Sequence, residues 1–335
     1  MGNKLNLGVR LDLLPEFSAE NVASLSILAE NEGFDSVWIP EGISRDALTE
    51  LAHVASKTSK ITLGTGILPI FYRDPTMTAM SAAGMDAISN HRFILGLGLG
   101  HKHMVEEIHG LPFQNSIAHI REMVTIVRQI LEENEVDFEG EFYTLKGATL
   151  GKLYEKPNVP IYLAALGPKM LELAGEIADG VLMNWVSPSY MKTAIQCIEK
   201  GAKKAKRSIS SIEIACYIRV MVTDHPAKAE PSLRRLIARY TFMPDYRKFF
   251  EMMGYHEDVT KIAEAWKNNG KEAAEEAVSM AMIQDIAIVG SAEYCKQEIK
   301  RFNSWGIRKP VIAPFAEPTN ALQTYSNTIR ALARI

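Results

Sequence analysis

Short apolar runs, several of them rich in β-branched residues, alternate with helical patterns along most of the chain. Buried parallel strands are continuous apolar runs, whereas helices repeat apolar residues every three or four positions. The sequence predicts eight strands, at residues 5–11, 36–40, 61–68, 93–99, 161–165, 181–183, 212–223 and 310–315. Strands that alternate with helices in this way favour an α/β fold, a (β/α)8 barrel forming a single domain over residues 1–335. A doubly wound open sheet is the alternative.

Several predicted helices have recognisable starts. Ser18 and Ser291 are typical helix caps, and Asp74 and Ser187 each precede a proline that suits the first helical turn. The helix that follows Asp74 is the third predicted helix. The spacing of apolar residues predicts that Met77, Met80, Gly84 and Ile88 line the inward side of this helix.

Two segments interrupt the alternation of strands and helices. Residues 136–145 are polar with a central glycine, which is typical of a hairpin. Residues 226–284, between the seventh and eighth strands, form an insertion that is mostly helical by pattern and contains five methionines. Methionine there is most often packing filler, and the alternatives are a lid or a subunit interface.

The segment from Pro160 to Trp185 reads as a compact strand–helix–strand unit. Its turn, Gly167-Pro168, leads into a helix with no acidic residue before Glu172. A turn of small residues before a helix exposes backbone N–H groups at the positive end of the helix dipole, which is a place for a phosphate. The alternative is a plain crossover in which glycine and proline only shape the turn.

Composition narrows the class of protein. The chain has 335 residues, a formal net charge of −3 and no basic stripe of the kind that nucleic acids require. We find no signal-peptide pattern and no apolar run long enough to span a membrane. The three cysteines are too far apart in sequence for a C-x-x-C pair, so we expect a reducing, cytoplasmic location.

Four motifs carry a resemblance that extends over nearly the whole chain. They are F-D-S-V-W-I-P-E at residues 34–41, I-T-L-G-T-G-I at 61–67, S-N-H-R-F-I-L-G-L-G-L-G at 89–100 and G-P-K-M-L-E-L-A-G-E-I-A-D-G-V-L-M-N at 167–184. They resemble the bacterial luciferase-like oxidoreductases, a family of flavin- and deazaflavin-dependent barrels. The last motif is especially similar to the branch that includes methylenetetrahydromethanopterin reductase, which uses coenzyme F420.

The resemblance implies a cofactor ring at the carboxyl ends of the strands and a cis peptide bond, without proline, at Gly66-Ile67. It also implies that the cofactor phosphate lies at Ala165, Leu166 and Gly167, in agreement with the helix-dipole argument. Small residues there would let a phosphate reach backbone N–H groups. The candidate cofactor-binding residues are Gly66, Ile67, Ala164, Ala165, Leu166, Gly167, Pro168, Lys169 and Asn184.

The candidate catalytic residues are Glu41 and His101. The deazaflavin branch often has an Asp-His pair after the second strand, where this chain has Glu41-Gly42, and an acidic residue after the fourth strand, where it has Gly100-His101. A histidine there is suited to acid–base chemistry at neutral pH, and the alternative is a solvated loop residue. We expect no metal site, because the neighbouring histidines lack acidic partners at ligand spacing. Trp38 and Met183 are predicted core residues.

Three functions from different classes are consistent with these motifs. The leading hypothesis is an oxidoreductase that transfers a hydride between coenzyme F420 and an organic substrate. The second is an FMN-dependent luciferase-like monooxygenase, and the third is a non-catalytic barrel that binds a flavin-like ligand or none. The family also implies a homodimer, and we expect a small-molecule substrate as the other partner, with no nucleic acid and no membrane.

Overall fold

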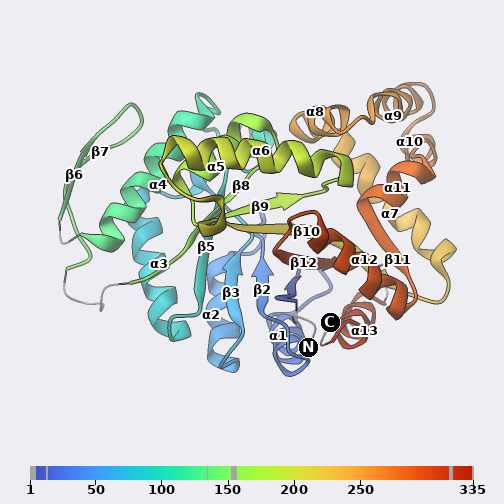
Figure 1. The fold of residues 1–335 in the computed structure, drawn as a ribbon, viewed down its shortest axis with the longest axis horizontal. Helices are drawn as coiled ribbons and strands as arrows, with labels where there is room; N and C mark the ends of the chain where they lie inside the picture. The colour runs from blue at the N-terminus through green and yellow to red at the C-terminus, as the bar shows by residue number, and fades with distance from the viewer. Residues whose placement is uncertain (1–4, 13, 134, 152–156, 317–319, 334–335) are drawn as a thin grey trace.

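Eight parallel strands close into a barrel in the computed structural model, which describes residues 5–12, 14–133, 135–151, 157–316 and 320–333 (Figure 1). The barrel strands are β1 (Gly8–Arg10), β2 (Ser36–Ile39), β3 (Thr62–Thr65), β5 (Phe93–Gly98), β8 (Ile161–Ala164), β9 (Gly180–Asn184), β10 (Glu213–Val222) and β12 (Lys309–Pro314). They pair in chain order, and β12 pairs with β1 to complete the ring. The predicted (β/α)8 barrel is confirmed, and the open-sheet alternative is wrong.

Helices cover the outside of the ring. They are α1 (Ala19–Asn31), α2 (Ala47–Lys57), α3 (Pro75–Ser89), α4 (Ser116–Glu132), α5 (Pro168–Ile177), α6 (Pro188–Lys204), α12 (Ala292–Ser304) and α13 (Ala321–Ala331). The side chains of Ser18, Asp74 and Ser291 each accept a backbone N–H in the first turn of their helix. These starts therefore follow from local sequence, as predicted.

The third predicted helix, α3, does not bury the side that was predicted to face inward. Met77, Met80 and Ile88 are 46%, 49% and 59% exposed, so the predicted lining faces solvent. The buried side carries Ala79 and Ala82 instead. Small residues allow α3 to pack closely against the barrel, and this close approach decides which side of the helix is buried.

Short elements modify the regular pattern. The antiparallel pair β6 (Val136–Glu139) and β7 (Thr144–Ala148) confirms the predicted hairpin, which projects from one side of the barrel (Figure 1). The third predicted strand, 61–68, is two strands, since β3 ends at Thr65 and β4 (Leu68–Pro69) pairs with β5. The remaining short helical turns are Ile70–Tyr72, Met104–Ile108 and Ile209–Ser211.

Five helices follow β10 and lie together at one end of the molecule (Figure 1). They are α7 (Pro226–Thr241), α8 (Pro244–Met252), α9 (His256–Asn269), α10 (Lys271–Glu276) and α11 (Met280–Ile286). The chain then forms β11 (Ala287–Gly290), a strand that the sequence pattern did not predict. It pairs in parallel with Arg219–Val222, the part of β10 beyond its pairing with β9.

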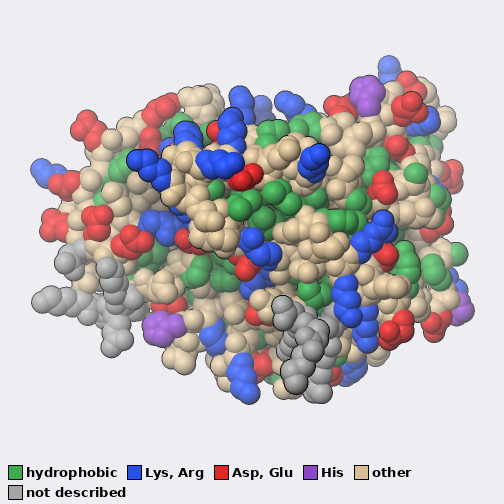
Figure 2. Space-filling model, viewed as in Figure 1, with side chains coloured by type: hydrophobic (Ala, Val, Ile, Leu, Met, Phe, Trp, Pro, Cys, Tyr) green, Lys and Arg blue, Asp and Glu red, His purple; other side chains and the backbone are tan. Residues whose placement is uncertain are grey.

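Charges are mixed over the surface. Figure 2 shows lysine and arginine interspersed with aspartate and glutamate on one face, without a region of a single sign. Within the part of the chain that the structure describes, no helix is both long and apolar enough to cross a membrane.

An ion cluster joins three consecutive outer helices. Arg121 of α4 donates two hydrogen bonds to Glu176 of α5, at 2.7 and 2.8 Å, and Lys204 of α6 donates a third, at 2.9 Å. Hydrogen bonds from Arg121 lower the pKa of Glu176 to about 2, against burial, which raises it, and Lys204 adds to the lowering.

This cluster should make stability depend on pH. The pKa of Glu176 is lower in the folded protein than in the unfolded chain, so its contribution is complete above the unfolded pKa of 4.5 and is lost as the pH falls towards about 2. We expect Glu176→Gln to reduce the free energy of unfolding at neutral pH and the difference from wild type to shrink through this window. Urea unfolding at a series of pH values measures it. A difference that stays constant with pH would contradict this assignment.

Candidate active site at the carboxyl ends of the barrel strands

The inner face of the barrel changes character along its strands. Its lower part is an apolar cluster of Trp38, Ile94, Tyr162, Leu182, Ala215, Tyr217, Val311 and Ala313, packed with Ile67. Side chains on a strand alternate, so residues an even number of positions farther along also face inward. These are Gly98, Ala164, Asn184 and Arg219, and Arg10 of β1 lies in register with the inward Trp38. Together they bring polar and small residues to the carboxyl end of the barrel, which we call its mouth. Barrels of this class carry their active sites at this end.

The peptide bond between Gly66 and Ile67 is cis, as the resemblance implied. Gly66 donates its N–H to the carbonyl of Ile39 at 2.8 Å, and the carbonyl of Ile67 accepts the N–H of Glu41 at 3.2 Å. From across the barrel, Tyr217 donates its hydroxyl to the Gly66 carbonyl at 3.2 Å. A β-carbon on Gly66 would lie 1.8 Å from that hydroxyl oxygen, so only glycine fits. The segment at Gly66-Ile67, which we call the bulge, is therefore hydrogen-bonded on one side to residues at the end of β2 and on the other to β10.

The turn from β8 into α5 has the features of an anion site. Gly167 caps α5, Pro168 occupies the first turn and no acidic residue lies in that turn. No described residue accepts a hydrogen bond from the backbone N–H of Leu166 or Gly167. A β-carbon on Gly167 would meet no described atom within 4 Å, and its φ of −82° suits any residue, so the described part of the fold does not require this glycine. The open space in front of the N–H groups suits a ligand.

A second group of candidate residues lies where β5 and β9 end. Asn184 donates a hydrogen bond to the hydroxyl of Tyr246 at 2.8 Å, and the ring of Tyr246 lies 6.1 Å from that of His101. Burial lowers the pKa of His101, and the nearby imidazole of His103 lowers it further. His101 therefore favours the neutral imidazole at neutral pH, which can accept a proton at one nitrogen and donate one from the other.

Glu41, the other candidate catalytic residue, is occupied by its neighbours. One carboxylate oxygen accepts the backbone N–H of Ala47, at the start of α2, at 2.7 Å. The other accepts a hydrogen bond from Arg73 at 3.1 Å. The Glu41 side chain is 8% exposed. Through these two hydrogen bonds, and through its own N–H bond to Ile67, Glu41 connects α2 and the loop after β4 to the Gly66-Ile67 segment. Lys169, by contrast, is exposed beside the α5 turn, and Trp38 and Met183 are buried core residues, as predicted.

Sequence reasoning missed the polar cluster in the mouth of the barrel. It consists of Arg10, Tyr217, Arg219, Tyr240 and Tyr246, of which the last two come from α7 and α8. The strand pattern held one signal, since Arg219 interrupts an apolar run at the same inward parity as Tyr217. The partners of Arg219 lie far away in sequence, so the pattern alone could not identify the cluster.

Several buried polar atoms in this region have no hydrogen-bond partner among the described residues. They are Arg10 Nε, Tyr72 Oη, Arg73 Nε, Asn184 Oδ1, Trp185 Nε1 and Arg219 Nη1. Buried polar groups are nearly always paired in folded proteins, and an unpaired one costs about 1–3 kcal/mol. Their accumulation at the carboxyl ends of the strands, beside the turn that leads into α5, fits a polar cofactor and substrate bound there. No group of three or more potential metal ligands occurs among the described side chains.

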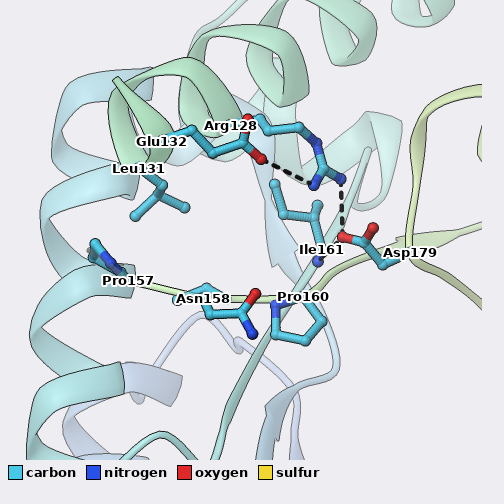
Figure 3. Close-up of a pocket in the computed structure, with 9 residues that line it drawn as sticks. Arg128, Leu131, Glu132, Pro157, Asn158, Pro160, Ile161 and Asp179 are labelled. Atoms are coloured by element: carbon cyan, nitrogen blue, oxygen red, sulfur yellow. Dashed lines mark hydrogen bonds and ion pairs between the residues drawn. The ribbon is translucent and has the colours of Figure 1, made fainter. Parts of the chain in front are cut away.

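A cleft of about 600 Å³ opens at the opposite end of the barrel. Arg128, Glu132 and Asp179 line it together with Asn158 and Pro160, before the start of β8 (Figure 3). Arg128 donates a hydrogen bond to Asp179 at 2.9 Å, and Asp179 also accepts the N–H of Ile161 at 2.8 Å. Because Arg128 and Asp179 are already paired with each other, this cleft is not our candidate active site.

Comparison with known proteins gives a consistent result. The family model described as luciferase-like monooxygenase matches residues 7–309. The 5,10-methylenetetrahydromethanopterin reductase of Methanopyrus kandleri is 31% identical over 319 residues, covering 90% of this chain and 91% of that protein. The F420-dependent glucose-6-phosphate dehydrogenase of Kineococcus radiotolerans is 32% identical over 248 residues, covering 70% and 73%.

The fold agrees as well. The structure of the coenzyme F420-dependent tetrahydromethanopterin reductase of Methanopyrus kandleri superposes with a TM-score of 0.85 at 29% identity, covering 99% of this chain and 98% of that one. The matched barrel and the extent of the family match lead to one conclusion: this chain belongs to the luciferase-like monooxygenase family of enzymes.

Proposed function

We propose that the protein is an oxidoreductase that transfers a hydride between coenzyme F420 and a small organic substrate. The observation that carries the proposal is the pair of open backbone N–H groups, those of Leu166 and Gly167, at the start of α5, whose first turn has no acidic residue. Relatives named for F420-dependent reactions support this choice of cofactor. When bound, the deazaflavin ring supplies a hydride donor or acceptor, because a carbon replaces one flavin nitrogen.

In this proposal the protein binds and orients the cofactor. Leu166, Gly167 and Lys169 donate backbone N–H groups to the phosphate, and the positive end of the α5 dipole adds to the attraction. Ile67, with Gly98 and Ala164 beside it, forms the wall behind the ring. A β-carbon on Gly98 would lie 2.9 Å from Ile67 and 3.0 Å from Ala164, so glycine lets these residues approach one another.

His101 is our proposed proton-transferring residue. It lies beside Tyr246, and its lowered pKa keeps the imidazole neutral at physiological pH. A neutral imidazole can take up or release the proton that accompanies hydride transfer at the substrate. Glu41 has a positioning role in the proposal, because its two oxygens already hold Ala47 and Arg73.

Cofactor titration tests the proposed function. The purified protein, freed of cofactor, is titrated with coenzyme F420 and separately with FMN, and binding is followed by fluorescence quenching. We expect binding of F420 at micromolar concentration and much weaker binding of FMN. Tight binding of FMN with none of F420 would replace the proposal by the FMN-dependent monooxygenase.

We also propose that the protein is a homodimer whose contact includes the exposed row on α3. Met77, Met80 and Ile88 form this row, and exposed apolar patches on globular proteins often mark interfaces. Introducing a charge at the centre, with Met80→Glu, should shift the mass measured by light scattering from twice the 37.3 kDa chain mass towards the single value. Met280→Glu is the matched control, because Met280 is 42% exposed on α11. If only Met280→Glu dissociates the dimer, the interface lies in the helices after β10.

A further inference from the structure

Arg219 is a buried cation that has no counter-charge among the described residues. It is 3% exposed and lies in β10, facing the mouth of the barrel. Among the described residues, none forms an ion pair with it or accepts a hydrogen bond from it, and its Nη1 is fully buried and unpaired. Its guanidinium lies 4.3 Å from the ring centre of Trp185, and this cation–π contact is the principal interaction that it makes. A buried charge normally persists only where a partner neutralises it.

The surrounding charges leave this excess uncompensated. The other arginine in the mouth, Arg10, forms an ion pair with Asp12, and Tyr325 also donates a hydrogen bond to Asp12 at 3.4 Å. Among the described side chains, Asp12 is therefore the one carboxylate that pairs with either of these two guanidinium groups. Burial raises the pKa of Tyr240, on α7. The positive charges of Arg219 and Arg10 outweigh burial, so the pKa of Tyr240 lies below its usual value. Asp245, on the neighbouring α8, is exposed to solvent.

Among the described side chains near Arg219, the unpaired buried atoms include three donors, on Arg10, Trp185 and Arg219 itself, and one acceptor, Asn184 Oδ1. Trp185 is 1% exposed, and its buried indole Nε1 has no partner among the described residues. The rings of Trp185 and Tyr240 lie 5.3 Å apart, so the tyrosine hydroxyl belongs to the same group of side chains. A guanidinium, an indole N–H and a phenol together suit an oxyanion, because carboxylate and phosphate accept several charge-assisted hydrogen bonds at once.

We propose that the substrate carries an anionic oxygen group, a carboxylate or a phosphate, that Arg219 binds in the mouth of the barrel. This inference rests on the proposed function, in which the substrate enters at this end. The cofactor phosphate has a separate place at the start of α5, after β8, whereas Arg219 lies in β10 with β9 between them. Helices α7 and α8 contribute Tyr240 and Tyr246 to the same mouth, so the segment after β10 takes part in selecting the substrate.

Calorimetric titration with simple anions tests the proposal. The probes are inorganic phosphate and malonate, with sodium chloride at matched ionic strength as the reference. Each titration is made on the protein alone and on the protein saturated with coenzyme F420, which occupies the α5 turn. We expect one phosphate or malonate site that remains in the F420-saturated protein. The tighter of the two anions identifies the group on the substrate.

The variants are Arg219→Met, Arg219→Lys and the control Arg308→Met. Arg308 is 40% exposed at the opposite end of the barrel, where it pairs with Glu213. Arg219→Met should weaken anion binding by about 10- to 100-fold, the loss expected for charge-assisted hydrogen bonds. Arg219→Lys keeps the charge without the planar fork and should lose less. It also provides the measurement if the methionine variant does not fold.

Two results would overturn the proposal. One is anion binding that is the same in Arg219→Met, or in folded Arg219→Lys, as in the wild type. The other is a loss of F420 affinity in these variants that is as large as the loss of anion affinity. That result would mean that Arg219 binds the cofactor and not the substrate. If the wild type binds no F420, the proposed function fails, but the titrations without cofactor still show whether Arg219 binds an anion.

Discussion

Gly66→Ala is expected to reduce the free energy of unfolding by about 1–3 kcal/mol, the usual cost of overpacking a buried site. The new methyl group would lie 1.8 Å from the hydroxyl oxygen of Tyr217, so one of the two groups must move. Moving Tyr217 breaks its hydrogen bond to the Gly66 carbonyl and disturbs the bulge that we place behind the cofactor ring. Cofactor affinity should therefore fall together with stability.

A double-mutant cycle with Tyr217→Phe isolates this clash. Phenylalanine removes the hydroxyl, which should cost about 1 kcal/mol for the lost hydrogen bond, and leaves the ring carbon 3.1 Å from the new methyl group. In that background Gly66→Ala should therefore cost much less than in the wild type. Gly167→Ala serves as the control for a glycine with open space around it. Urea unfolding of the five proteins gives the energies, and equal costs of Gly66→Ala in the two backgrounds would refute the explanation.

Gly167→Asp is expected to weaken cofactor binding by about 1–3 kcal/mol, roughly 5- to 150-fold, because a fixed negative charge would occupy the place of the phosphate. The protein should still fold, since the new side chain enters open space and the backbone conformation is ordinary. A carboxylate at a helix N-terminus even favours the helix. Loss of binding without loss of stability would therefore indicate a ligand site.

Two further variants sharpen this test. Gly167→Ala adds bulk without charge, so it separates the steric part of the effect from the electrostatic part. Lys169→Ala removes an exposed charge and should cost only about 0–1 kcal/mol. Titrations with coenzyme F420 and FMN, accompanied by thermal melts, measure all three. If folded Gly167→Asp binds its cofactor as tightly as the wild type, the phosphate binds elsewhere.

Much of the fold was predictable because its causes are local. Apolar runs of strand length, caps such as Ser18 and the proline after Gly167 act through neighbouring residues, and the structure has the corresponding elements. The turn into α5 could be proposed as an anion site for the same reason, since helix ends expose N–H groups whatever surrounds them. The cis bond at Gly66-Ile67 was expected from the family resemblance, and no local pattern indicated it.

Contacts between distant segments decided the rest. Met77 and Met80 of α3 face solvent because the alanines on the other side of the helix fit more closely against the barrel. One carboxylate oxygen of Glu41 accepts a hydrogen bond from Arg73, which comes from the loop after β4. The sequence pattern gave no indication of this contact.

The sequence by itself thus determined the order of the eight barrel strands and the barrel that they close, and it located the turn that we propose binds a phosphate. Only the tertiary structure decided what lies in the mouth of that barrel. Closure brings both Arg10 of β1 and Arg219 of β10 close to Tyr240, with Asp12 as the nearby carboxylate. The balance of charge in a buried site depends on which side chains share it in space, and hydrophobic periodicity carries no information about that.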